Sequence, residues 1–174
     1  MRTGSLSTRT THPYFLRLIQ DTLDDVGLRI NLNNPYEAAT KGEMLVGCAD
    51  QGLLSNLAGA STSCGRYSRT GFRHCGRCVP CQVRRGAYLA WGHSDDTEKG
   101  YKYNDLSVND SKHARFDDVR SVGIAIERVR NDGIDELIGG AMNSQLLGNV
   151  QPYRDVVDRG IAELAALHAS LRIP

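Results

Sequence analysis

The stretch that decides the fold is Cys75-Gly76-Arg77-Cys78-Val79-Pro80-Cys81, in which every third residue is a cysteine. Each two-residue gap lets the chain curl so that successive sulfur atoms point to one centre, and Gly76 permits the tight turn. Cys64, a short distance upstream, can supply a fourth sulfur. Four thiolates without a histidine are typical of a closed, structural Zn²⁺ site, because a catalytic zinc keeps one position open for water or substrate.

Disulfide bonds and redox chemistry are the alternatives to metal binding. The chain has five cysteines, an odd number, and a reducing cytosol would keep them as thiols, so a disulfide framework is not expected. A redox Cys-x-x-Cys motif is the competing interpretation, but two overlapping copies and the upstream Cys64 argue against it. Cys48 stands apart, in an apolar helical pattern, and is expected to be a small buried hydrophobic residue.

Length and composition indicate an ordinary globular chain. Its 174 residues, 40% of them hydrophobic, suffice to bury a core without a disulfide framework. No apolar run is long enough to span a membrane, and the polar start lacks the apolar run of a secretion signal, so a cytoplasmic location is expected.

The net charge of +1 hides a basic segment. Residues 61–92 contain six arginines and no acidic residue. This segment could be a solvated surface, a site for an anion such as phosphate or nucleic acid, or a countercharge for the thiolates of the zinc site.

Apolar periodicity predicts a mainly α-helical chain with one short strand. Leu28, Ile30 and Leu32 alternate with polar residues and give the strand. Thr40-Lys41-Gly42-Glu43 has the spacing of a capping box and should begin a helix, with Met44, Leu45 and Cys48 on its apolar face. Gly52 should separate that helix from the next. The remaining expected helices cover 13–26, 80–91, 114–129, 134–147 and 153–171.

From Pro35 through Thr40-Lys41-x-Glu43 to Cys64, Cys75-Gly76-x-Cys78-x-x-Cys81 and Arg84, the chain resembles the C-terminal part of the QueC family of 7-cyano-7-deazaguanine synthases. The resemblance covers residues 9–92, and the four cysteines match the zinc ligands of that family. Helix 113–130 and the ending Tyr153–Gly160 look more like QatC, the QueC-like component of an anti-phage defence system.

The resemblance and the residue pattern together predict a division of the chain into four parts. Residues 1–60 would be the end of an α/β PP-loop ATP pyrophosphatase domain that lacks its nucleotide-binding sheet. Residues 61–92 would be the zinc loop and its helix, 93–112 a polar linker, and 113–174 a C-terminal helical extension.

The implied chemistry is ATP-dependent adenylation of a carboxylic acid, followed by conversion with ammonia to an amide or nitrile, as in queuosine biosynthesis. ATP and Mg²⁺ would serve only the complete enzyme, together with a deazapurine-type substrate. The Ser-Gly-Gly-x-Asp-Ser loop that holds the nucleotide in that family does not occur here. A separate nucleotide-binding half or a homo-oligomer is therefore the expected partner, and an exposed apolar face should mark where it binds.

Three further residues are substrate-site candidates through the resemblance. Lys41 could face an anionic substrate or nucleotide beside Glu43, or the two could simply belong to a capped helix with a solvated lysine. Arg84 could clamp a carboxylate or phosphate, or only balance the thiolates. The histidines show no catalytic spacing. The rival hypothesis is a non-catalytic zinc knot that binds a protein or nucleic acid, although nucleic acid is less expected because few exposed aromatic residues accompany the arginines.

Overall fold

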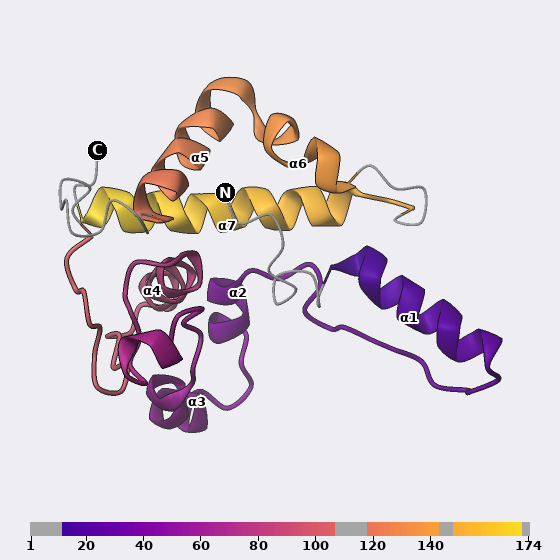
Figure 1. Ribbon diagram of the computed structural model, residues 1–174, viewed down its shortest axis with the longest axis horizontal. Helices are drawn as coiled ribbons and strands as arrows, with labels where there is room; N and C mark the ends of the chain where they lie inside the picture. The colour runs from indigo at the N-terminus through magenta and orange to yellow at the C-terminus, as the bar shows by residue number, and fades with distance from the viewer. Residues whose placement is uncertain (1–11, 107–117, 143–147, 172–174) are drawn as a thin grey trace.

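The computed structural model describes residues 12–106, 118–142 and 148–171 and is mainly helical (Figure 1). Within these residues no strand forms, and His74 and Tyr101 make an isolated bridge. None of the described helices is long and apolar enough to cross a membrane. The helical elements, including two short 3₁₀ turns, are α1 (Pro13–Asp25), α2 (Lys41–Val46), α3 (Gln51–Leu57), η2 (Ala58–Ala60), η3 (Ser68–Thr70), α4 (Val79–Trp91), α5 (Asp118–Asp132), α6 (Ile134–Met142) and α7 (Gln151–Ser170).

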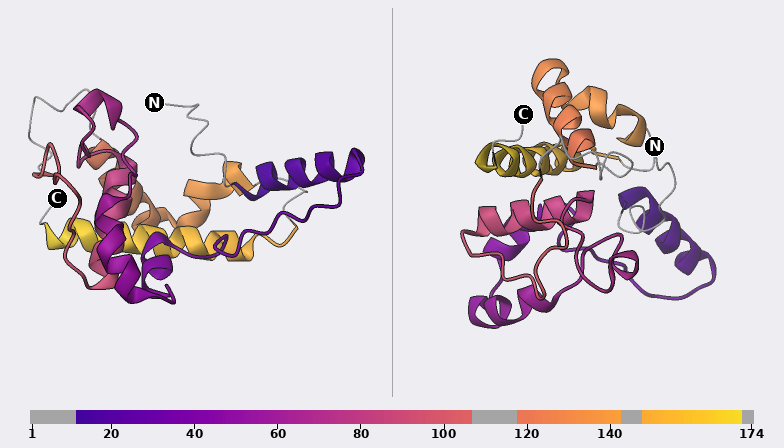
Figure 2. Two further views of the ribbon diagram at one scale, coloured as in Figure 1. Left: turned by 90° about the horizontal axis from the view of Figure 1, so that it is seen from below. Right: turned by 60° about the vertical axis from the view of Figure 1, so that its left-hand side comes forward.

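Helix α4 is the centre of the body, which we define as residues 40–106, 118–142 and 148–171. It packs against α2 and α7, while α5 and α6 cover another side of α7 (Figures 1 and 2). The helices approach closely at glycines. A Cβ atom added to Gly42 would lie 2.7 Å from Ala90 Cβ, and one added to Gly86 would lie 3.3 Å from the carbonyl oxygen of Glu163. Small residues at these positions thus allow the three helices to pack.

The C-terminal helices share a core with the cysteine-bearing helix. Val122 and Ile126 of α5 pack with Leu164 of α7, and Val83 of α4 packs against this cluster. A second cluster joins Leu106, which precedes α5, to Val119 and Leu167. Helices α5 and α7 are therefore part of the body's packing.

Two side chains of α7 hold the start of α2. The Thr40 hydroxyl donates to the Glu163 carboxylate, which also accepts from the Gly42 amide at 3.3 Å. Arg159 pairs with Glu43 and donates to the Ala38 carbonyl at 2.7 Å. The expected capping box is confirmed, since Thr40 and Glu43 each accept from the other's backbone amide, at 3.0 and 2.8 Å. This end of α2 is fixed both locally and by α7.

Residues 13–36, which we name the arm, project from the body (Figures 1 and 2). The expected helix is confirmed as α1, but it contains no buried residue. The expected strand at 28–32 is wrong. The segment is extended without a neighbouring strand, and the Gln20 side chain takes a partner's place by bonding Ile30 O at 2.9 Å and Leu32 N at 2.8 Å. Helix and segment together leave apolar side chains exposed, namely Tyr14, Phe15, Leu18, Val26, Leu28, Ile30 and Leu32.

The region around Cys48 differs from the prediction. Helix α2 ends at Val46 with Gly47 as its C-cap, and Asp50 caps α3 by accepting from the Leu53 amide at 2.8 Å. The break thus falls before Gly52, which lies inside α3. Cys48 consequently sits in the turn, half-buried, with its thiol 3.6 Å from the Asp50 carbonyl. It is not the buried core residue that the helical pattern predicted.

The other expected helices agree with the described residues. Pro80 lies in the first turn of α4, and Gly92 follows it with φ +74°. Helices α5, α6 and α7 occupy the predicted regions. The predicted start at 114 and the predicted end at 147 lie outside the described residues.

Candidate metal centre

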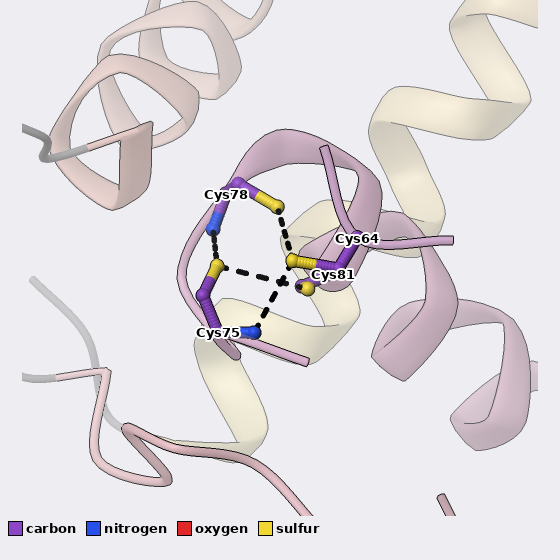
Figure 3. Close-up of side chains that lie close together, drawn as sticks. All are labelled: Cys64, Cys75, Cys78 and Cys81. Atoms are coloured by element: carbon purple, nitrogen blue, oxygen red, sulfur yellow. Dashed lines mark hydrogen bonds between the residues drawn. The ribbon is translucent and has the colours of Figure 1, made fainter. Parts of the chain in front are cut away.

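Four cysteines converge on one point at the start of α4 (Figure 3). Their sulfur atoms all lie within 4.8 Å of one another, with Cys64 Sγ 3.9 Å from Cys78 Sγ and Cys75 Sγ 3.8 Å from Cys81 Sγ. A Zn–S bond of about 2.3 Å places the sulfurs of a regular tetrahedron about 3.8 Å apart. A disulfide requires about 2.05 Å. The arrangement therefore fits a four-cysteine metal site and excludes disulfides among these residues.

Backbone amides point at the sulfurs. Gly76 has φ +88°, a conformation that glycine adopts without strain, and the turn brings the Cys78 amide 3.3 Å from Cys75 Sγ. The amides of Cys75 and Arg66 approach Cys64 Sγ at 3.2 and 3.4 Å. Such N–H groups stabilise a thiolate more than a thiol. The local fold thus favours the charged sulfurs that a metal requires.

The crowded sulfurs cannot all ionise without a cation. The thiols of Cys78 and Cys81 donate to Cys75 Sγ and hold the pKa of Cys75 well below its usual range. The same contacts raise the pKa of Cys78 to about 12, and that of Cys81 still further, with burial adding to the rise. A divalent cation removes this conflict because its charge stabilises every thiolate around it. The donor set therefore suits Zn²⁺.

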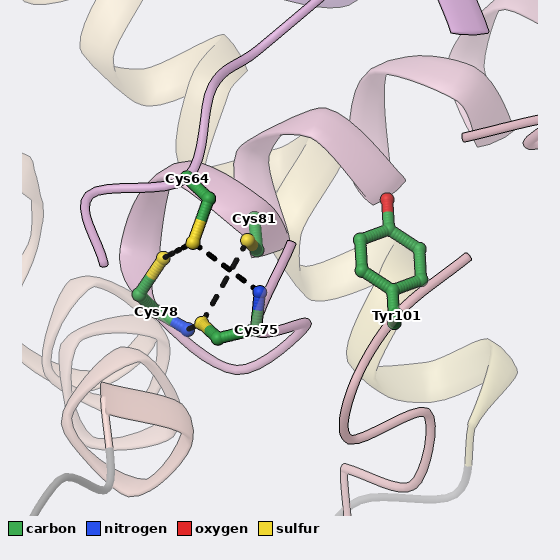
Figure 4. Packing of buried hydrophobic residues seen from close by; sticks show 5 residues of the cluster. All are labelled: Cys64, Cys75, Cys78, Cys81 and Tyr101. Carbon is green, nitrogen blue, oxygen red and sulfur yellow. Dashed lines mark hydrogen bonds between the residues drawn. The ribbon is translucent and has the colours of Figure 1, made fainter. Parts of the chain in front are cut away.

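The centre is closed to solvent. Cys81 is fully buried, Cys75 and Cys78 are 2% exposed, and Cys64 is 8% exposed. Tyr101 belongs to the same buried cluster (Figure 4), and Tyr67 and Tyr103 pack against it. Four protein ligands in a closed shell leave no position for substrate, which is the pattern of structural zinc.

Residues 93–106, which we name the strap, cover the centre. The amides of Lys102 and Tyr103 donate to the carbonyls of His74 and Cys75, at 2.8 and 3.0 Å. A Cβ atom on Gly76 would lie 2.3 Å from the Tyr103 carbonyl oxygen, so the strap rests directly on the cysteine turn. Within the predicted polar linker at 93–112, residues 93–106 are irregular and bond to the metal loop through their backbone. The remaining residues of that linker lie outside the described part.

The arginines of the basic segment mostly bond within the chain. Arg73 donates to Tyr101 O at 2.8 Å, Arg77 to Asp105 O at 2.8 Å and Arg85 to Asn104 O at 3.0 Å, all on the strap. Arg66 lies 3.5 Å from Asp118 of α5. The side chains that make this segment basic therefore tie the metal loop to its neighbours.

The Arg84 side chain is buried and donates hydrogen bonds to several segments of the chain. Its Nε donates to Thr97 Oγ1 at 2.7 Å, Nη1 to Ser61 Oγ at 2.7 Å, and Nη2 to the carbonyl of Ala58 at 2.7 Å and the hydroxyl of Tyr88 at 3.3 Å. The guanidinium is thus committed to the chain itself. This geometry gives Arg84 a structural role and speaks against the carboxylate or phosphate clamp that the resemblance implied.

The other two substrate-site candidates separate. Glu43 faces Arg159, whose hydrogen bond lowers the pKa of the Glu43 carboxyl. Lys41 is exposed, its amine 3.8 Å from Met44 Sδ, and it lines a cavity together with Arg84. The structure therefore brings Lys41 and Arg84 to one cavity, while it turns Glu43 towards α7.

Two buried polar residues connect the centre to α7, and periodicity did not reveal them. Gln82 is fully buried; its amide donates to Arg77 O at 2.9 Å, and its oxygen lies 2.9 Å from His168 Nε2. Burial lowers the pKa of His168, so the ring stays neutral at neutral pH. The only sequence signal was that each stands among apolar residues of its helix.

Comparisons with known proteins add no assignment. No family model, no curated protein and no solved structure matches this chain. The metal centre therefore rests on its own geometry.

Proposed function

We propose that this chain is the zinc-bearing C-terminal portion of a QueC-like ATP-dependent synthase. In this proposal the zinc is structural, and the arm binds a separate nucleotide-binding half. The observation that carries the proposal is the combination of a closed four-cysteine centre with an arm whose helix contains no buried residue. A closed centre supplies stability rather than chemistry. An exposed apolar face on a rigid body indicates a partner.

The extended segment of the arm has the form of a strand whose neighbouring sheet would be supplied by the other half. Leu28, Ile30 and Leu32 are about half exposed and lie on alternate positions of an extended segment. Alternate residues of extended chain share one face, so an adjoining sheet could cover these side chains. In the complete enzyme, such a half would bring the Ser-Gly-Gly-x-Asp-Ser loop, ATP and Mg²⁺. This chain would contribute zinc-dependent rigidity and a wall of the substrate site that includes Lys41.

The rival nucleic-acid-binding role has weaker support. Phosphate binding requires cationic side chains on the surface. Here Arg84 is buried, and Arg73 and Arg85 are bonded to backbone carbonyls of the strap. The basic segment is thus better explained by internal bonding.

Co-expression tests the proposal. The tagged chain is produced together with a nucleotide-binding half that carries Ser-Gly-Gly-x-Asp-Ser, and the readouts are co-purification and pyrophosphate release from ATP in the presence of the acid substrate. We expect a stable complex with activity that neither part has alone. Ile30→Asp should abolish the complex because it places a charge on the apolar face. Asn31→Asp, on the opposite face of the extended segment, is the matched control and should leave it intact.

Two results would overturn the proposal. The first is a chain that stays monodisperse and does not co-purify with any such nucleotide-binding half. The second is a complex that is equally insensitive to both substitutions.

A further inference from the structure

A cavity of about 280 Å³ lies at the joint between the arm and the body, where the start of α1 approaches the first turn of α7 (Figure 1). Its walls are one face of α1 with Leu16 and Arg17, the extended segment with Leu32, the turn that carries Glu37, and Tyr153 of α7. Sites for drug-sized ligands have volumes of roughly 300–1,000 Å³. This cavity is slightly smaller, so it suits a small metabolite.

Two opposite charges line this cavity without pairing with each other. Among residues 12–106, 118–142 and 148–171, Arg17 makes no hydrogen bond and no ion pair, with Glu37 or with any other residue. Burial raises the pKa of Tyr153, the Glu37 carboxylate raises it further, and Arg17 opposes the rise, so both charges lie near the same hydroxyl. A ligand that carries an anion and a cation could pair with both side chains at once, whereas a simple anion or cation would leave one of them unpaired.

The two charged side chains are held by different parts of the molecule. Arg17 belongs to α1, which Gln20 fastens to the extended segment of the arm. Glu37 is followed by Ala38, whose carbonyl accepts from Arg159 of α7 at 2.7 Å. Arg17 is thus fixed by the arm and Glu37 by the body. A ligand that contacts both would fasten the arm to the body.

The rest of the cavity wall is partly apolar. Pro13, Leu16 and Leu32 line it, and Leu32 is 43% exposed. An aliphatic group that covered this surface would gain roughly 25 cal/mol for each Å² of apolar area removed from water. A carboxylate, an ammonium group and an aliphatic side chain on one small molecule are the features of an apolar α-amino acid.

We propose that this cavity binds a free α-amino acid with an aliphatic side chain. Its carboxylate pairs with Arg17, its ammonium group pairs with Glu37, and its side chain packs against Leu16 and Leu32. The inference comes from this cavity alone. It requires neither ATP nor the nucleotide-binding half, so it and the proposed function can fail separately.

Titration of the zinc-loaded full chain with L-leucine tests this inference. Isocaproate and isoamylamine are the matched probes, because they keep the leucine side chain and lack the ammonium group and the carboxylate, respectively. Backbone amide NMR shifts report both the affinity and the place of binding. We expect shifts clustered on the first turns of α1 and α7 and on residues 32–37. Leucine should bind about 2- to 5-fold more tightly than either analogue, which is the size of an exposed ion-pair contribution.

Three variants locate the contacts. Arg17→Met keeps an apolar stem and should remove the preference for leucine over isoamylamine, whereas Arg29→Met changes an arginine of the arm outside the cavity wall and should retain it. Glu37→Gln should remove the preference for leucine over isocaproate. Equal affinities of the unmodified chain for the three probes, shifts centred on the metal loop or α5, or no binding at low-millimolar leucine would each overturn the proposal.

Discussion

The arm and the body differ in what holds them. The body surrounds a cysteine cluster that is nearly inaccessible to solvent, and buried hydrogen bonds of Gln82 and Arg84 connect its elements. The arm has a well-formed helix, yet no residue of that helix is buried. One chain thus contains a region that buries its own core and a region whose apolar surface is exposed. Regular secondary structure alone does not distinguish the two.

Loss of zinc should produce the largest difference between the two regions. Cys78→Ser removes a ligand, and structural zinc contributes roughly 10–16 kcal/mol of apparent binding free energy in small knots. We expect the body to lose cooperative thermal unfolding and zinc content to fall well below one ion per chain. Cys48→Ser is the control, because its thiol lies outside the cluster, and it should change neither quantity. Full cooperativity in a zinc-free Cys78→Ser chain would remove the basis of the metal assignment.

Matched truncations of leucine sharpen the comparison. Leu167 is 5% exposed in the body core and Leu18 is 40% exposed on the arm. Leu167→Ala should lower the free energy of unfolding by about 2–5 kcal/mol, as expected for a buried leucine. Leu18→Ala should cost below about 0.5 kcal/mol in the isolated chain. Chemical denaturation measures both, and equal losses would mean that the arm is buried in solution.

A smaller difference is expected between two glycines of the metal loop. Gly76 and Gly71 both have positive φ, but an added Cβ collides with the Tyr103 carbonyl only at Gly76. Gly71→Ala should cost about 1 kcal/mol from backbone conformation alone. Gly76→Ala should cost about 2–3 kcal/mol because the strap must also move. If the two thermal melts shift equally, the strap does not rest on the turn as described.

Local patterns predicted much of the molecule. Cysteine spacing identified all four sulfurs of the cluster, and Pro80 and Gly92 marked the ends of α4, because these features depend on neighbouring residues only. Alternation failed at 28–32, since a strand exists only when another strand pairs with it. The sequence pattern also did not show that the strap bonds to the backbone of His74 and Cys75, which lie far away in sequence.

The substrate-site predictions show the same limit. The resemblance selected Lys41, Glu43 and Arg84 together. Only the fold reveals that the guanidinium of Arg84 donates its hydrogen bonds to Ser61, Ala58 and Thr97. The sequence does not show whether a charged side chain faces a ligand or a carbonyl of the chain itself. Burial and partners decide between these roles.

The contact of Glu163 with Thr40 and Gly42 has a consequence for how the chain acquires its shape during translation. The partners are separated by 123 and 121 residues, whereas the cysteines lie within one short stretch. Closing a short loop costs less entropy than closing a long one. The metal can therefore be captured while the ribosome is still adding residues. The start of α2, by contrast, is left without its α7 contacts until Glu163 has emerged.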